Sequence, residues 1–139
     1  MRQHQATLTV RAQGRGLQEI TAEVARIVDR SGVRTGICHV FVRHTSASLL
    51  IQENADPTAR ADVERWLDRL APEGDPGYVH TAEGPDDMPS HLKSAVTRTA
   101  EAIPVTEGRL ALGTWQGLYL CEHRRRAPAR TLIVHVIGE

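Results

Sequence analysis

Residues Gly36–Gln52, which read GICHVFVRHTSASLLIQ, decide the fold class of this 139-residue chain. Two runs of β-branched and apolar residues, Gly36–Val42 and Ala47–Gln52, have the composition of buried strands. The polar corner Arg43-His44-Thr45-Ser46 separates them. We therefore predict two adjacent strands, with polar side chains gathered at the point where the strands meet.

Segments on both sides of this pair carry further strand and helix patterns. Gln5–Ala12 alternates with period two, which predicts an edge or outer strand. Apolar residues at helical spacing predict one helix from Leu17 to Ser31 and another from the Asp56-Pro57 cap signal to Leu70. A short third helix is expected from Pro89, and closing strands are expected at 103–106, 109–112, 115–121 and 130–137. The expected buried faces are Ala59, Val63, Trp66, Leu67 and Leu70 in the second helix, and Leu92, Ala95, Val96 and Thr99 in the third.

These elements predict one α+β domain over residues 1–139, a sheet-rich, β-sandwich-like and mostly antiparallel fold with about three helices. Ala71–Pro89 is rich in Pro, Gly, Asp and Glu, so we expect a long surface loop with one small strand at most, near Gly77–Val79. Long loops in compact domains tend to be functional. Local composition nevertheless favours reading Glu83, Asp86 and Asp87 as solvated loop charges.

Composition argues against several classes of partner. The chain has 17 basic and 17 acidic side chains, so no net field draws it to nucleic acid or to an anionic membrane. It has one Phe, two Tyr and two Trp, which leaves few platforms for stacking bases. Cys38 and Cys121 lie in apolar segments, as buried thiols of a reduced compartment do. With no signal-peptide pattern or membrane-length apolar run, we expect a cytoplasmic protein with no nucleic-acid or membrane partner.

Three of the seven histidines stand beside turns or helix starts: His44, His80 and His91. Together with a carboxylate they match the ligand set of a Zn²⁺-type site with an open position. Their spacing is not the short HxH or HExxH kind, so acid–base work or phosphate binding competes with metal ligation. The sequence has no GxSxG, Walker or GxGxxG motif.

Strand alternation places Thr114, Gln116 and Glu122 on one face of the strand that follows Gly113. The three polar groups could converge on a ligand. Leu118 and Leu120 share that face, however, so the polar residues could also be exposed strand ends beside the core. Asp56 has a similar alternative, because its carboxylate could do no more than cap its helix.

Three segments of this sequence resemble the signatures of the YjbQ family, and the likeness extends from Leu8 to the C-terminal Ile137-Gly-Glu. The first is His44-Thr-Ser-Ala-Ser with Glu53-Asn54 and Asp56-Pro57. The second is Asp86-Asp-Met-Pro-Ser-His91. The third is Gly113-Thr-Trp-Gln-Gly117 with Glu122-His-Arg124, followed by the local Arg-rich run that ends at Arg126.

The resemblance implies a sheet-rich α+β fold, a homotrimer and secondary thiamine-phosphate synthase activity. That reaction joins hydroxymethylpyrimidine diphosphate to thiazole phosphate and releases pyrophosphate, which a divalent cation, Mg²⁺ or Zn²⁺, would neutralise. The alternatives are a metal-dependent phosphoester hydrolase and a non-catalytic binding module for a phosphorylated metabolite. The implied catalytic residues are His44, Ser46, Asn54, Asp56, His91, Thr114, Gln116 and Glu122, with Glu53, Asp87 and Arg124 for the substrate and its phosphate, and His44, His80 and His91 for the metal.

Overall fold

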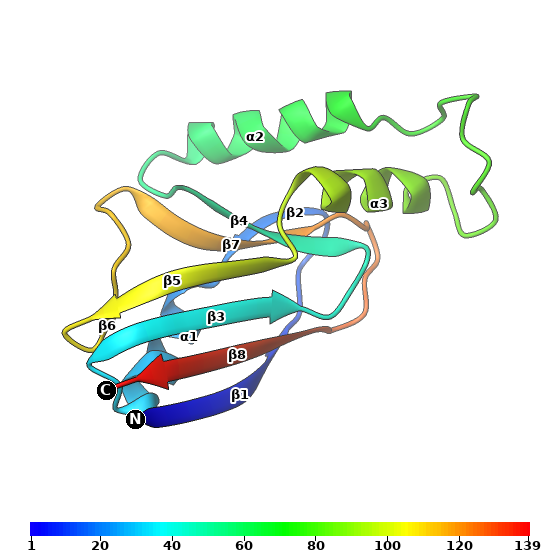
Figure 1. Cartoon of the computed structure of the whole chain (residues 1–139). Coiled ribbons are helices and arrows are strands. Elements are labelled where there is room, and N and C mark those ends of the chain that lie inside the picture. Colours follow the sequence, from blue (N-terminus) through cyan, green and yellow to red (C-terminus); the bar gives the residue numbers. More distant parts are fainter.

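The computed structural model describes residues 1–139 and contains two antiparallel sheets and three helices (Figure 1). Sheet A has the strand order β1-β8-β3-β5-β6, and sheet B has the order β2-β7-β4. The strands are β1 (Arg2–Val10), β2 (Gly16–Glu19), β3 (Thr35–Val42), β4 (Ala47–Glu53), β5 (Ala100–Thr106), β6 (Arg109–Leu110), β7 (Gln116–Glu122) and β8 (Arg130–Gly138). The helices are α1 (Thr21–Ser31), α2 (Pro57–Leu70) and α3 (Asp87–Val96). The predicted sheet-rich α+β class is confirmed.

The sheets pack around a core of 18 buried residues, which α1 closes on one side. In β3 the residues Cys38, Val40 and Val42 face this core, and alternation sends Ile37 and Phe41 to the outer face of sheet A. Cys38 and Cys121 are buried free thiols, as predicted. No helix of the structure is long and apolar enough to cross a membrane.

Two predictions about strand placement were wrong. Strands β3 and β4 are not neighbours, because β3 pairs with β5 and β8 whereas β4 pairs with β7. The polar corner at 43–46 therefore crosses from sheet A to sheet B. Leu17–Glu19, predicted as the start of a helix, belongs to strand β2 (Gly16–Glu19), because the backbone of β2 pairs with β7 over Tyr119–Glu122.

The helices over the outer face of sheet B bury only some of the residues predicted for them (Figure 1). In α2 only Leu67 is fully buried, while Trp66 and Leu70 are about half exposed. In α3 the buried residues include Asp87, Ser90 and Lys93, whereas Val96 is 56% exposed. The reason is that α3 covers a polar end of the sandwich, so its inner face is polar. Residues 71–86 form a loop without a strand.

Candidate functional site

Three side chains that could hold a metal ion meet at one end of the sandwich: His80, Asp87 and His91. One ligand atom from each lies within 4.8 Å of the other two. The Oδ2 atom of Asp87 is 2.6 Å from Nε2 of His80 and 3.0 Å from Nε2 of His91. Two imidazoles and one carboxylate form a ligand set that suits Zn²⁺ and leaves coordination positions open. We call these three residues the His–Asp cluster.

Local structure explains how the His–Asp cluster forms. Asp87 is the first residue of α3, and His91 follows one helical turn later on the same face. His80 comes from the preceding loop, and its ring lies 5.4 Å from that of His91. A loop that looked poorly anchored from its sequence is thus held to a helix by one shared carboxylate.

His91 has oxygen acceptors on both sides of its ring. Its Nδ1 atom lies 3.2 Å from the carbonyl oxygen of Thr45, and its Nε2 atom faces Asp87. A carbonyl only accepts, so Nδ1–H donates to Thr45 and orients the ring, as the outer contacts of metal-ligating histidines do. The ring then either carries a second proton on Nε2 or has room for a cation between Nε2 and the carboxylate.

Arg124 fixes the other side of Asp87. Its Nη1 atom donates to Oδ1 of Asp87 over 2.5 Å, and its Nε atom lies 3.2 Å from Oδ1 of Asp86. Oδ2 of Asp86 also accepts from the Arg125 backbone N–H. Asp86 and Asp87 are only 7% and 3% exposed, so their reading as solvated loop charges was wrong.

The Asp87 carboxylate is ionised in this setting. Burial raises the pKa of Asp87, but hydrogen bonds from His80, together with the charge and hydrogen bond of His91 and the charge of Arg124, outweigh burial and leave the pKa below its ordinary value. The same balance holds for the pKa of Asp86, where burial is outweighed by hydrogen bonds from the Arg125 backbone and from Arg124. Two negative charges are therefore kept at the start of α3.

Beneath the His–Asp cluster lies a buried ion pair between Glu122 and Arg130, both at most 2% exposed. The guanidinium is bidentate, with Nε to Oε1 at 2.7 Å and Nη2 to Oε2 at 2.6 Å. Glu122 also accepts the backbone N–H of Arg124, and Arg130 also donates to the carbonyl of Ser46. Glu122, predicted as a catalytic residue, is thus fully engaged in joining β7 to β8.

The structure does not bring His44 into the His–Asp cluster. Its Nε2 atom accepts the backbone N–H of Thr131 over 2.8 Å, and its Nδ1 atom lies 3.4 Å from Nη1 of Arg130. Burial and the Arg130 charge lower the pKa of His44, which keeps the ring neutral. His44 and His91 nevertheless line one open pocket of about 760 Å³, together with Phe41, Ser46 and Ala95.

The remaining predicted residues lie at the opposite end of β7. Gln116 pairs with Glu53 and Glu122 pairs with Ala47, so Gln116 and Glu122 are six residues apart, about 20 Å along the strand. Thr114, Gln116 and Glu122 therefore do not converge. Around this far end, Gln116 accepts from Gly113, Asn54 donates to Glu19, Glu53 accepts the Asp56 backbone N–H, and Asp56 caps α2 through Thr58.

Sequence reasoning did not single out Arg130, the partner of Glu122. No local pattern could have identified it, because a charge at the start of a strand is ordinarily solvated and the partner comes from a different sheet. Lys93 and His123 are both only 3% exposed, and no local sequence pattern could have identified them as buried either.

This fold and this site define a class of small two-sheet α+β proteins with a histidine–carboxylate cluster at one end of the sandwich. The family model described as "UPF0047 protein YjbQ-like" matches residues 6–139, and the chain belongs to this family. A UPF0047 protein from Synechocystis sp. is 53% identical over 99% of this chain and 94% of its own length. The UPF0047 protein YjbQ from Escherichia coli O157:H7 is 44% identical over 98% of this chain and 99% of its own.

A crystal structure of a conserved hypothetical protein from Thermus thermophilus is also similar. Its TM-score is 0.85 at 33% sequence identity, and the match covers 95% of this chain and 99% of that one. The predicted family resemblance is confirmed over nearly the whole chain.

We predict that Glu122→Gln destabilises the fold by about 3–5 kcal/mol, because it leaves the Arg130 guanidinium buried without a countercharge. Urea denaturation followed by circular dichroism measures this loss. The matched control is Glu23→Gln, which removes an exposed pair with Arg26 and should change stability by less than about 0.5 kcal/mol. Equal effects of the two substitutions would contradict the structural role of Glu122.

We predict that the protein binds one Zn²⁺ per chain. His80→Ala should weaken Zn²⁺ binding at least roughly 100-fold, because losing a metal ligand costs at least as much affinity as losing a residue that only orients a ligand. Affinity should fall as the pH is lowered, because protons compete with the metal for the imidazoles. Titration against a chromogenic chelator, with elemental analysis, provides the measurement. Arg109→Ala, at the exposed β5–β6 turn, should bind like the unmodified protein, and unchanged binding by His80→Ala would exclude the cluster as a metal site.

Proposed function

We propose that this chain is a metal-dependent enzyme that cleaves a phosphate or pyrophosphate ester of a small molecule. The observation that carries the proposal is the His–Asp cluster at the wall of an open pocket. His91 belongs to both, so a substrate in the pocket would lie next to the ion. A divalent ion there would stabilise negative charge on a leaving group and lower the pKa of a water molecule.

The ligand atoms of the His–Asp cluster favour one kind of metal ion. Imidazole nitrogens suit Zn²⁺ and similar transition ions, whereas Mg²⁺ prefers oxygen ligands and retains several waters. Since two of the three donors are imidazoles, we propose Zn²⁺ in preference to Mg²⁺. Asp87 supplies the anionic ligand, and its bond to Arg124 fixes the position of the carboxylate.

The pocket is suited to a small substrate. Its volume of about 760 Å³ falls within the range of small-molecule sites, and Phe41 and Ala95 give it apolar surface. Arg43 offers a cation and Ser46 a hydroxyl at the same pocket. We propose that the phosphate of a substrate lies towards His91 and that an apolar or ring portion lies towards Phe41.

Two reactions fit this arrangement. In the transferase reaction of the thiamine-phosphate synthase type, the thiazole nitrogen forms a bond to the pyrimidine methylene carbon, and the C–O bond to pyrophosphate breaks. In the hydrolase reaction, water attacks phosphorus and the ester alcohol leaves. The family resemblance supports the transferase, and the histidine-rich donor set supports the hydrolase.

We predict metal-dependent turnover that His91→Ala lowers at least roughly 100-fold, because this variant removes a ligand of the ion. The substrate is hydroxymethylpyrimidine diphosphate, with and without thiazole phosphate. Pyrophosphate that appears only with the thiazole identifies a transferase, while inorganic phosphate without it identifies a hydrolase. Arg109→Ala is the control, because this exposed side chain lies outside the cluster and the pocket. Saturable binding of the diphosphate with neither product would instead identify a binding module and refute the enzyme.

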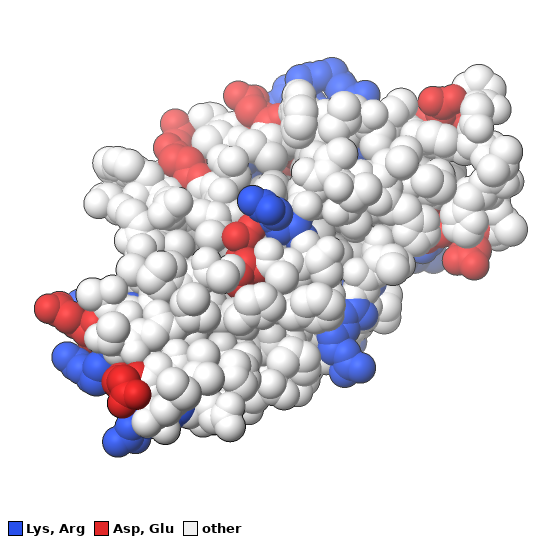
Figure 2. Space-filling view, viewed as in Figure 1, with Lys and Arg blue, Asp and Glu red and all other residues white.

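We also propose that the protein is a homotrimer assembled through the outer face of sheet A. No helix covers this face, and Figure 2 shows few charged side chains over β1, β8 and β3. Ile37 and Phe41 are 45% and 42% exposed, and their cross-strand neighbours on β8 are Ile137 and Ile133. An apolar patch of this kind is typical of an interface. Because Phe41 also lines the pocket, a neighbouring subunit would wall one side of it.

Light scattering at micromolar concentration should report about three times the chain mass of 15.3 kDa. The double substitution Ile37→Glu and Phe41→Glu should yield monomers, because it places two charges in the apolar patch. Substituting the exposed Glu107 and Arg109 at the β5–β6 turn serves as the control and should leave the mass unchanged. A monomeric unmodified protein would exclude the assembly.

A further inference from the structure

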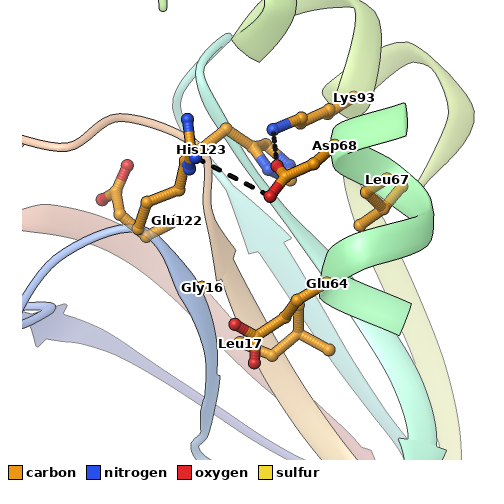
Figure 3. Close-up of a pocket in the computed structure, with 9 residues that line it drawn as sticks. Gly16, Leu17, Glu64, Leu67, Asp68, Lys93, Glu122 and His123 are labelled. Carbon is orange, nitrogen blue, oxygen red and sulfur yellow. Dashed lines mark hydrogen bonds and ion pairs between the residues drawn. The ribbon is translucent and has the colours of Figure 1, made fainter. Parts of the chain in front are cut away.

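A second, smaller cavity lies between α2, α3, β2 and the end of β7 (Figure 3). Its volume is about 140 Å³, and none of the residues of the His–Asp cluster lines it. The polar residues of its wall are Arg15, Glu64, Asp68, Lys93, Glu122 and His123, and the apolar ones are Leu17 and Leu67. This cavity takes no part in the proposed function above.

Hydrogen bonds fix how His123 faces the cavity. The Thr97 hydroxyl donates to the carbonyl of Lys93 over 2.7 Å, so in the 2.5 Å contact between Ser48 and Thr97 the serine is the donor. Ser48 must then accept from Nε2–H of His123, which lies 2.8 Å away. Nδ1 therefore keeps its lone pair, and it has no hydrogen-bond partner in the protein. Burial and the nearby Lys93 charge lower the pKa of His123 to about 3, so the ring is neutral.

Lys93 is a second group on the cavity wall that has hydrogen-bonding capacity left over. Its side chain is 4% exposed, and its Nζ atom donates to Oδ1 of Asp68 over 2.6 Å. An ammonium has three N–H donors, and this is the one hydrogen bond that Nζ makes in the protein. Buried charges are stabilised only when their remaining donors also find acceptors. Lys93 thus offers donors to whatever occupies the cavity.

Glu64 provides the opposite wall. Figure 3 shows its carboxylate beside Gly16 and Leu17, away from the end where Lys93, Asp68 and His123 lie. The carboxylate makes no hydrogen bond or ion pair in the protein. Glu122 pairs with Arg130, Lys93 with Asp68 and Arg15 with Glu73, so Glu64 is the one charged group of the wall without a partner. The cavity thus offers an unpaired carboxylate at one end and the unused donors of Lys93 at the other, which matches neither a simple anion nor a simple cation.

We propose that this cavity binds a small zwitterion of the amino-acid type. The carboxylate of the ligand accepts from Lys93 at one end of the cavity, and its ammonium group donates to Glu64 at the other end. Leu17 and Leu67 leave an apolar surface for a short aliphatic side chain. The volume of the cavity suits such a small ligand, because an engineered cavity of about 150 Å³ in another protein accommodates benzene.

Isothermal titration calorimetry with alanine tests this site. Alanine should bind saturably and at least roughly tenfold more tightly than propionate or ethylamine, each of which lacks one of the two charges. Glu64→Gln should weaken alanine binding at least roughly tenfold, the size of one charge-assisted hydrogen bond. The matched control is Asp62→Asn, an exposed carboxylate on the same helix, which should leave alanine binding unchanged.

Arg15→Gln provides a second variant at the positive end of the cavity and should also weaken alanine binding. Glu64 and Arg15 are partly exposed, so both variants are expected to fold, and circular dichroism confirms this before titration. The proposal is overturned if alanine does not saturate the protein, if propionate or inorganic phosphate binds as tightly as alanine, or if Glu64→Gln and Asp62→Asn behave alike.

Discussion

The buried ion pair between Glu122 and Arg130 is the interaction on which this end of the molecule depends. It joins the last residue of β7 in sheet B to the first residue of β8 in sheet A. Two buried charges are tolerable only when they are paired and their other polar atoms are satisfied. Here the remaining atoms reach the backbone of Ser46 and Arg124, so the pair also fixes the corner between β3 and β4 and the chain leaving β7.

From that pair, contacts extend in one direction to the His–Asp cluster. Glu122 holds the backbone of Arg124, the Arg124 side chain holds Asp86 and Asp87, and Asp87 orients His80 and His91. A loop of sixteen residues, 71–86, is anchored by the charged contacts of Glu73, His80 and Asp86, not through an apolar core of its own. Such a chain of charge-assisted bonds gives fixed geometry in a small domain, which a metal site requires.

The same end of β7 supports two hydrogen-bond networks. Strand alternation turns Glu122 towards Arg130 between the sheets and His123 towards the helices, so two consecutive residues serve different networks. Both residues line the small cavity, whereas the open pocket beside the His–Asp cluster is lined by residues of β3, the 43–46 corner and α3. Helix α3 contributes to both through His91 and Lys93, which explains why its inner face is polar where its sequence predicted an apolar one.

The sequence alone determined the features that depend on residues close together in the chain. Alternation located most strands, the Asp56-Pro57 cap located α2, and turn-rich segments pointed to His80 and His91. Tertiary structure decided which distant segments meet. It placed β3 and β4 in different sheets, paired Gly16–Glu19 with β7, separated Gln116 from Glu122, and buried Asp87 and Arg130 together with their partners. The physical reason is that periodicity encodes the direction of a side chain relative to its own backbone, whereas the burial of a charge depends on a countercharge far away in the sequence.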